Sequence, residues 1–140
     1  MKIIIVGCGR VGSRLANDLD RAGHDVTIVD SNPDSFSRSA ARGTFGDDFR
    51  GTFVVGDGTE AELLRRAGIE QAECFIAVTQ GDNRNIMAAQ IARNVFEVPK
   101  VVCRIYDPIR EGVYRKLGLS VYCPTIEGAA TVERMIAEGA

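Results

Sequence analysis

Short apolar runs alternate along the chain with longer stretches in which apolar residues recur every three or four positions. The first run, 2–6, is continuous and β-branched, which is typical of a parallel strand covered on both faces. The same pattern predicts further strands at 26–29, 53–55, 74–78, 101–105 and 121–123. The intervening helical spacing predicts helices over about 10–22, 33–42, 59–67 and 82–95, then from 108 and from about 125.

The alternation of six strands with six helices defines the fold class. Successive strand–helix–strand units form right-handed crossovers between parallel strands, and the helices then cover both faces of the sheet. We therefore predict one α/β domain over residues 1–140, a doubly wound, Rossmann-like sheet of six parallel strands. Ligands of such sheets bind beyond the carboxyl ends of the strands where the strand order reverses, here between the first and fourth strands.

Local signals set the expected ends and faces of several elements. Val11, Leu15, Leu19 and Ala22 form an apolar stripe at helical spacing, which predicts the first helix. Thr59 and Glu62 have the spacing of a capping box, so a helix is expected to begin at Thr59. Residues 43–51 combine glycines, charges and two isolated phenylalanines, and are expected to form a loop.

The loop after the first strand reads Gly7-Cys8-Gly9-Arg10-Val11-Gly12. Glycine triplets also occur in ordinary turns, but this one follows a strand, opens a helix and precedes an acid, Asp30, by about 20 residues. In this fingerprint Gly7 permits the tight turn, Gly9 lets a pyrophosphate approach, and Gly12 lets helix and strand pack closely. The helix N-terminus adds free N–H groups for the phosphates. A purely structural turn is the alternative.

Asp30 closes the second strand and bears on the choice of nucleotide. Its carboxylate is expected to accept hydrogen bonds from the ribose hydroxyls and to repel a 2′-phosphate. Ser31, which we include in the site, follows Asp30. Residues 31–34 contain no arginine that could bind such a phosphate. NAD(H), ATP, ADP or AMP is therefore predicted in preference to NADP.

Polar residues also follow the strands that flank this loop. Arg10 could bind a terminal phosphate of ATP or be an ordinary solvated arginine. Asp57 could contact adenine or cap the next helix, and Asp82 could contact the ligand or act as a helix N-cap. The remaining candidates in these loops are Gly58, Thr79 and Asn83.

Composition narrows the function classes. The 17 basic and 19 acidic residues give a net charge of −2, too balanced for a nucleic-acid partner to be expected. No apolar run approaches the roughly 18–20 residues of a membrane span, and no signal peptide precedes the first strand. We expect a cytoplasmic domain without direct membrane insertion. One histidine, His24, and few lysines leave little for acid–base catalysis, so no catalytic residue is assigned.

The cysteines do not form a recognisable metal or redox motif. None has CxxC spacing or a paired histidine, so no metal site is expected. Cys8 lies in the glycine-rich loop and could respond to oxidation, but any small residue would satisfy that loop. The others, expected to be buried as apolar side chains, are Cys74, Cys103 and Cys123.

Seven segments along nearly the whole chain together carry a family resemblance: 4–12, Val29-Asp30, 56–59, 77–79, Asp82-Asn83, 103–108 and 117–119. In these segments the chain resembles the TrkA family, the cytosolic regulatory subunits of Trk/Ktr-type potassium transporters, also called the RCK or KTN N-terminal domain. The resemblance implies a gating module, not an enzyme, that binds NAD(H) or ATP/ADP competitively. It also implies a homodimer that assembles into rings beneath a membrane-embedded potassium transporter subunit, and hence a place at the inner face of the membrane.

The resemblance also assigns residues, position by position. The matching positions are Gly7, Gly9 and Gly12 for the phosphates, Asp30 for the ribose, Arg10 for the terminal phosphates of ATP, Asp57 near adenine and Thr79 beside the ligand. Some family members carry a glutamate, linked to divalent-ion binding, where Thr125 follows Pro124 here. The C-terminal ligand-binding subdomain of the family is expected to be absent from this chain.

The function expected is thus a nucleotide-sensing regulatory subunit of potassium uptake. The alternative is a small NAD-dependent oxidoreductase or a redox-sensing Rossmann module. The first would need a substrate domain with a positioned acid or base, and the second a DNA-binding helix-turn-helix segment. The sequence offers neither.

Overall fold

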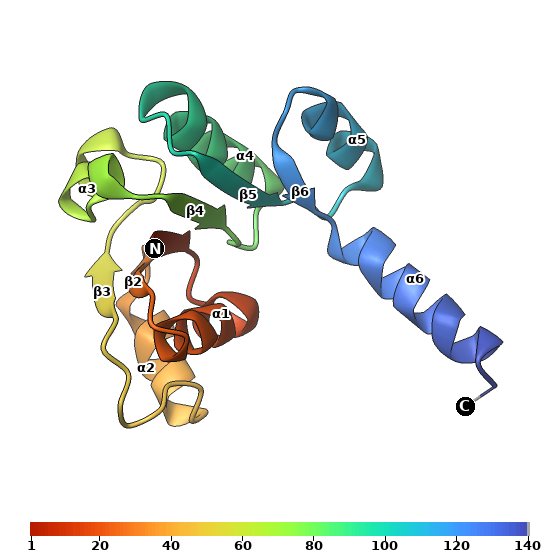
Figure 1. Ribbon diagram of the computed structural model, residues 1–140, viewed down its shortest axis with the longest axis horizontal. Coiled ribbons are helices and arrows are strands. Elements are labelled where there is room, and N and C mark those ends of the chain that lie inside the picture. Colours follow the sequence, from red (N-terminus) through yellow and green to blue (C-terminus); the bar gives the residue numbers. More distant parts are fainter. Residues whose placement is uncertain (140) are drawn as a thin grey trace.

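The computed structural model describes residues 1–139 and forms one parallel sheet with helices on both faces (Figure 1). The strands are β1 (Lys2–Val6), β2 (Asp25–Asp30), β3 (Thr52–Val55), β4 (Cys74–Ala77), β5 (Lys100–Arg104) and β6 (Ser120–Tyr122). The α-helices are α1 (Arg10–Arg21), α2 (Pro33–Ala41), α3 (Ala61–Arg66), α4 (Asp82–Gln90), α5 (Pro108–Lys116) and α6 (Pro124–Ala137). The strand order is β3-β2-β1-β4-β5-β6, with every neighbouring pair parallel, so the predicted doubly wound fold is confirmed.

Strand β1 lies at the centre and faces two separate cores. Ile3 and Ile5 belong to a cluster with Ala16 of α1, whereas Ile4 and Val6 belong to a cluster that includes residues of α3 and α4. Figure 1 shows α1 and α2 on one side of the sheet and α3, α4 and α5 on the other. Side chains alternate along a strand, so one apolar run supplies both cores.

The buried face of α1 differs from the predicted stripe. Val11 is 38% exposed and Leu15 is only half-buried, whereas Gly12 and Ala16 face the sheet. Small residues on this face let the helix approach β1 closely, so the larger residues lie beside the contact. Val11, exposed on the helix, lines the cavity described below.

Helix α3 begins later than the capping-box spacing predicts. Its first residue is Ala61 and its N-cap is Glu60, with no side-chain capping bond. Thr59 instead donates from both its backbone N–H and its hydroxyl to Asp57, which forms a local turn before the helix. The predicted capping box of Thr59 with Glu62 was wrong, because that turn already uses the threonine.

The predicted loop 43–51 is packed against the sheet and α1. Phe45 and Phe49 lie 4.6 Å apart between ring centroids, and both rings also contact Phe53 of β3. The loop is tied down at Gly46, whose N–H donates to Asn17 at 3.0 Å. The two phenylalanines therefore extend the α1-side core to the β3 edge of the sheet.

The carboxyl-terminal helices leave apolar side chains uncovered. Helix α6 projects away from the sheet in Figure 1 and buries no residue.

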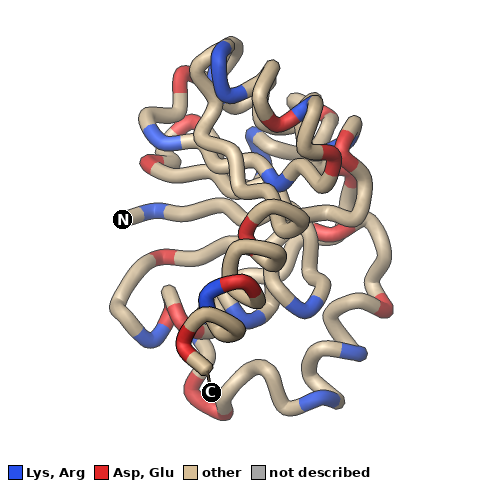
Figure 2. Tube along the Cα trace, turned by 90° about the vertical axis from the view of Figure 1, so that its right-hand side faces the viewer, with Lys and Arg blue, Asp and Glu red and all other residues tan. Residues whose placement is uncertain are grey.

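Figure 2 shows Lys and Arg interspersed with Asp and Glu along the trace. Within residues 1–139, no helix has both the length and the apolar character required to cross a membrane.

Candidate functional site

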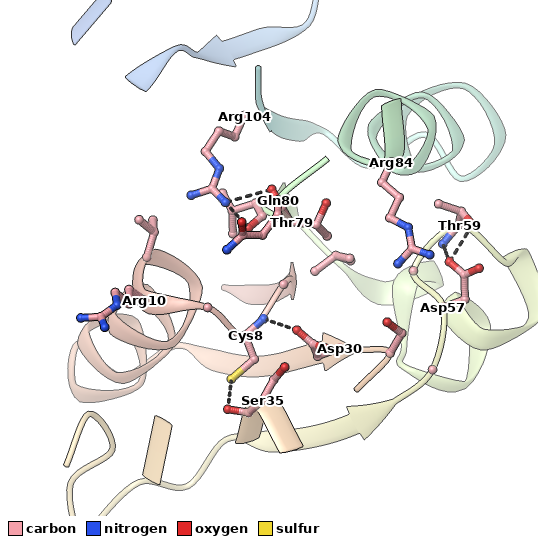
Figure 3. Close-up of a pocket in the computed structure, with 18 of the residues that line it drawn as sticks. Cys8, Arg10, Asp30, Ser35, Asp57, Thr59, Thr79, Gln80, Arg84 and Arg104 are labelled. Carbon is pink, nitrogen blue, oxygen red and sulfur yellow. Dashed lines mark hydrogen bonds between the residues drawn. The ribbon is translucent and has the colours of Figure 1, made fainter. Parts of the chain in front are cut away.

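A cavity of about 520 Å³ opens at the carboxyl ends of the central strands, where the order of the sheet reverses (Figure 3). The chain leaves β1 into α1 on one face and leaves β4 into α4 on the other, so the two loops diverge and leave a crevice. Ten of the predicted site residues line the cavity: Gly7, Cys8, Gly9, Arg10, Val11, Asp30, Ser31, Asp57, Gly58 and Thr79.

The three glycines of the loop have three different environments. Gly7 has φ +114°, and a Cβ there would lie 2.7 Å from the carbonyl oxygen of Val78. A Cβ on Gly12 would lie 1.8 Å from the carbonyl oxygen of Gly7, so Gly12 lies against the loop backbone and not in the cavity lining. A Cβ on Gly9 would meet nothing within 4 Å. Gly7 and Gly12 are thus required by the fold, whereas the space beside Gly9 is open.

Helix α1 starts at this open position. Its N-cap is Gly9, which has no side chain to occupy the free N–H groups of the first turn. No acidic residue lies in that turn, and Arg10 opens it. The helix therefore presents unpaired donors and partial positive charge to the cavity, an arrangement suited to an anion.

Asp30 is held in place by the backbone on both sides of the loop. One carboxylate oxygen accepts from the Cys8 N–H at 2.8 Å and the other from the Asn32 N–H at 2.9 Å. These bonds fix the carboxylate beside the glycine-rich loop, where it lines the cavity (Figure 3). The carboxylate keeps further lone pairs that can accept hydrogen bonds.

Asp57 lies two residues beyond the end of β3 and lines the cavity. It accepts from the Thr59 hydroxyl at 2.7 Å and the Thr59 N–H at 2.8 Å, and these two bonds hold the pKa of Asp57 below its ordinary value. The predicted role of Asp57 as a cap of the following helix is wrong, since Glu60 occupies that position. Asp57 closes a turn, and its carboxylate lies on the cavity wall.

Two predicted site residues, Asp82 and Asn83, are turned away from the cavity. The Asp82 carboxylate accepts from the N–H groups of Tyr106 at 2.8 Å and Asp107 at 3.2 Å. Asn83 accepts from the guanidinium of Arg110 at 2.6 Å. Asp82 is also not the N-cap of α4, which is Gly81. Both side chains bind the segment after β5, so neither lines the cavity.

Four arginines that the sequence did not single out also line the cavity: Arg38, Arg42, Arg84 and Arg104. With Arg10 they make five arginines against two aspartates, so the lining favours a negatively charged ligand. Arg38 and Arg84 lie on α2 and α4 and Arg42 directly follows α2, so these three converge on the cavity only after folding. For Arg104 the sequence did contain a signal, because this residue is a charge within the apolar run of β5.

Arg104 is the buried member of this group. It is only 6% exposed and donates to the carbonyl oxygens of Val78 at 2.8 Å and Thr79 at 2.9 Å. Its guanidinium lies 5.0 Å from the ring centroid of Tyr106. Its Nε has no hydrogen-bond partner within residues 1–139. Arg104 is thus a preorganised cation on the β4–β5 side of the cavity, facing the loop that carries Arg10 (Figure 3).

Cys74, Cys103 and Cys123 are buried, as predicted, and Cys8 of the glycine-rich loop is buried as well. All four are buried free thiols. The Cys8 sulfur points to α2, 3.6 Å from the Ser39 hydroxyl, and burial raises the pKa of that thiol. Burial also raises the pKa of Cys103, to about 12. The thiols of Cys8 and Cys103 therefore stay protonated at neutral pH.

The fold and the cavity together define the class of the protein. A parallel sheet with a glycine-rich loop at its switch point and an acid at the end of β2 is a Rossmann-like domain. Residues 3–124 match the TrkA-N domain model, and the chain belongs to the TrkA-N family.

Curated relatives agree with this assignment. The Trk system potassium uptake protein TrkA of Streptomyces coelicolor is 50% identical over 119 residues, which are 85% of this chain and 51% of that protein. A TrkA homolog of Methanothermobacter thermautotrophicus is 32% identical over 97% of this chain and 60% of its own length. The chain therefore spans about half of the length of the relatives it matches.

Solved structures share the fold at low sequence identity. The TrkA-N domain of the inner membrane protein ybaL from Escherichia coli has a TM-score of 0.79 at 19% identity, covering 96% of this chain and 95% of its own. The Shewanella denitrificans Kef CTD in AMP-bound form has a TM-score of 0.78 at 22% identity, covering 100% and 83%. The GsuK channel bound to NAD has a TM-score of 0.67 at 19% identity, covering 86% and 21%.

Proposed function

We propose that this chain is the nucleotide-binding part of a regulatory subunit of a Trk/Ktr-type potassium uptake system. The observation that carries the proposal is the open space at Gly9, beside the uncapped N-terminus of α1 and in a cavity with an excess of arginines. The names of the relatives, Trk system potassium uptake proteins, support the potassium-uptake role. Two solved structures of the same fold, one in AMP-bound form and one bound to NAD, support a nucleotide as the ligand.

The proposed pose follows from the charges around the cavity. The ribose of an adenosine moiety places its two hydroxyls on Asp30, and the first phosphates lie against Gly9 and the start of α1. Groups beyond these phosphates extend over the β4 side of the cavity, between Arg10 and Arg104. NAD(H), ATP, ADP and AMP all fit this scheme, because each carries the same adenosine 5′-phosphate.

Selection against NADP is a separate part of the proposal. Asp30, held by two backbone N–H groups, opposes a phosphate on the adenosine 2′-oxygen. Arg38 and Arg42 of the cavity lining oppose that selection, because they would attract such a phosphate. We propose that Asp30 dominates because it lies at the end of β2, at the position that receives the ribose hydroxyls.

The role we propose is regulatory and not catalytic. The described cavity lining contains neither histidine, the commonest general acid or base in enzymes, nor lysine. Regulation would act by population shift: two nucleotides that bind two arrangements of the assembly with different affinities move the equilibrium between them. A nucleotide with equal affinity for both arrangements would have no effect.

We further propose a homodimer, able to assemble into a ring, whose membrane-embedded partner holds it at the inner face of the membrane. Exposed apolar side chains recur along α5, where Ile109 is 82% exposed and Val113 is 53% exposed. Helix α6 adds Ile136 at 74% exposed and buries nothing within the chain. Exposed apolar side chains of this kind favour a protein partner, for which a second copy is our proposal.

Calorimetric titration with AMP, ADP, ATP, NAD, NADH and NADP, beside light scattering for mass, tests this function. We expect the first five nucleotides to bind, NADP to bind more weakly, and the mass to correspond to a dimer or a multiple of it. Arg10→Ala should weaken ATP more than AMP, since AMP lacks the terminal phosphates. Absence of heat with every adenosine nucleotide would refute the proposal.

A further inference from the structure

Asn85, the fourth residue of α4, is a fully buried polar side chain directly behind the cavity wall. Its Oδ1 accepts from the Thr79 N–H at 2.8 Å and from the Thr79 hydroxyl at 2.6 Å. Its Nδ2 donates to the Thr79 carbonyl at 2.9 Å and to the Arg104 carbonyl at 3.0 Å. One amide group therefore ties the segment that follows β4 to the end of β5.

The chemistry of these four bonds requires an amide. Two of the partners of Asn85 are donors and two are acceptors, and a carboxamide supplies both functions in one planar group. A carboxylate could accept from Thr79 but would face two carbonyl oxygens, and an apolar side chain would leave buried backbone groups unpaired. Arg104 strengthens the same junction, because its guanidinium donates to Val78 and Thr79.

Asn85 itself does not line the cavity, but both residues that it holds do. Thr79 and Arg104 lie at the ends of β4 and β5, on the opposite side of β1 from Asp30. In the nucleotide pose above, this side receives the groups beyond the first phosphates. Asn85 therefore acts on one half of the site only.

We propose that Asn85 is a positioning residue that sets the preference of the site for long nucleotides over AMP. It holds Thr79 and Arg104 where the second half of a dinucleotide, or the terminal phosphates of ATP, would lie. The inference rests on the proposed nucleotide function and adds to it the residue that governs ligand length. A residue needed only for folding would change the amount of folded protein and leave the NAD-to-AMP affinity ratio as it is.

Two variants separate these roles. Asn85→Asp keeps the size of the side chain and the two acceptor bonds to Thr79 but removes both donor bonds. Asn85→Ser is a milder change that keeps a small polar group, and it serves if Asn85→Asp does not fold. The matched control is Asp20→Ser: Asp20 is also buried and accepts from a backbone N–H, that of Arg50 at 3.1 Å, but lies on α1 and outside the cavity lining.

The measurement is the dissociation constant of each folded variant for AMP and for NAD by calorimetry, beside its denaturation midpoint. We expect the AMP constant to stay within about twofold and the NAD constant to rise at least tenfold in the Asn85 variants, a difference of about 1.4 kcal/mol. Asp20→Ser should lower the midpoint and change neither constant. Equal loss for both nucleotides, or loss for neither, would overturn the inference; failure of the unaltered protein to bind either nucleotide would instead remove the proposed function.

Discussion

Adding one methyl group at Gly9 should weaken nucleotide binding without harm to the fold. The backbone of Gly9 has φ −86° and ψ −158°, which alanine adopts without strain, and a Cβ there meets no atom within 4 Å. Replacing glycine at such a position commonly raises the free energy of unfolding by about 0.4–1 kcal/mol, since the unfolded chain loses freedom. The methyl group would instead occupy the space through which a phosphate reaches the backbone.

The expected loss of affinity follows from the contacts that the methyl group excludes. A hydrogen bond to a charged group contributes about 1.5–3 kcal/mol, so preventing one such contact weakens binding about ten- to hundredfold. Gly12→Ala should behave in the opposite way. Its Cβ would lie 1.8 Å from the Gly7 carbonyl oxygen, so α1 must move away from the loop. With overpacking at about 3 kcal/mol and a gain in helix propensity of about 1 kcal/mol, we expect a net loss of stability of about 2 kcal/mol.

Urea denaturation and calorimetry with ADP distinguish these outcomes. Gly9→Ala should unfold at or above the urea midpoint of the unaltered protein and bind ADP weakly, whereas Gly12→Ala should unfold earlier. Gly112→Ala is the control, because its Cβ also meets no atom within 4 Å but lies on α5, away from the cavity. If Gly9→Ala binds ADP as tightly as the control does, the phosphates do not lie at the start of α1.

Three further predictions concern single side chains. Asp30→Ala should weaken AMP, ADP and NAD together by at least tenfold in titration, because all share the ribose; an effect on none of them would place the ribose elsewhere. The pKa of Asp57 is lowered in the folded state by its bonds to Thr59, so its contribution to stability is present above the ordinary aspartate pKa of about 3.9 and is lost as the pH falls through the lowered value. Asp57→Asn should therefore reduce the fall in unfolding free energy that acidification causes, as measured by denaturation at a series of pH values. The same fall in the variant as in the unaltered protein would contradict this. Burial raises the pKa of Cys8 and of Cys103, the latter to about 12, and all four cysteines are buried. The folded protein should therefore react slowly with a thiol reagent at pH 8, and all four thiols should be labelled only in denaturant. Rapid labelling of Cys8 in the folded protein would reopen a redox role.

Local pattern was sufficient for the fold and for one half of the site. The continuous apolar run of β1 and the helical spacing that follows it predicted the crossovers, because a strand buried on both faces must be apolar throughout. The glycine-rich loop and Asp30 were predictable for a related reason: the tight turn, the close packing of Gly12 on Gly7 and the acid at a strand end are requirements of adjacent backbone. These constraints act within one strand–helix–strand unit and so appear in the sequence.

The other half of the site was decided by contacts between distant segments. The bonds of Asp82 to the backbone after β5 turned a predicted ligand contact into a structural one, and nothing in the spacing between those segments indicates them. The convergence of Arg38 from α2 and Arg104 from β5 on one cavity likewise depends on the positions of both elements on the sheet. The sequence by itself thus determined which backbone forms the proposed phosphate site, since that depends on neighbours along the chain. Only the tertiary structure decided which charged side chains surround it, because that depends on the order of the strands.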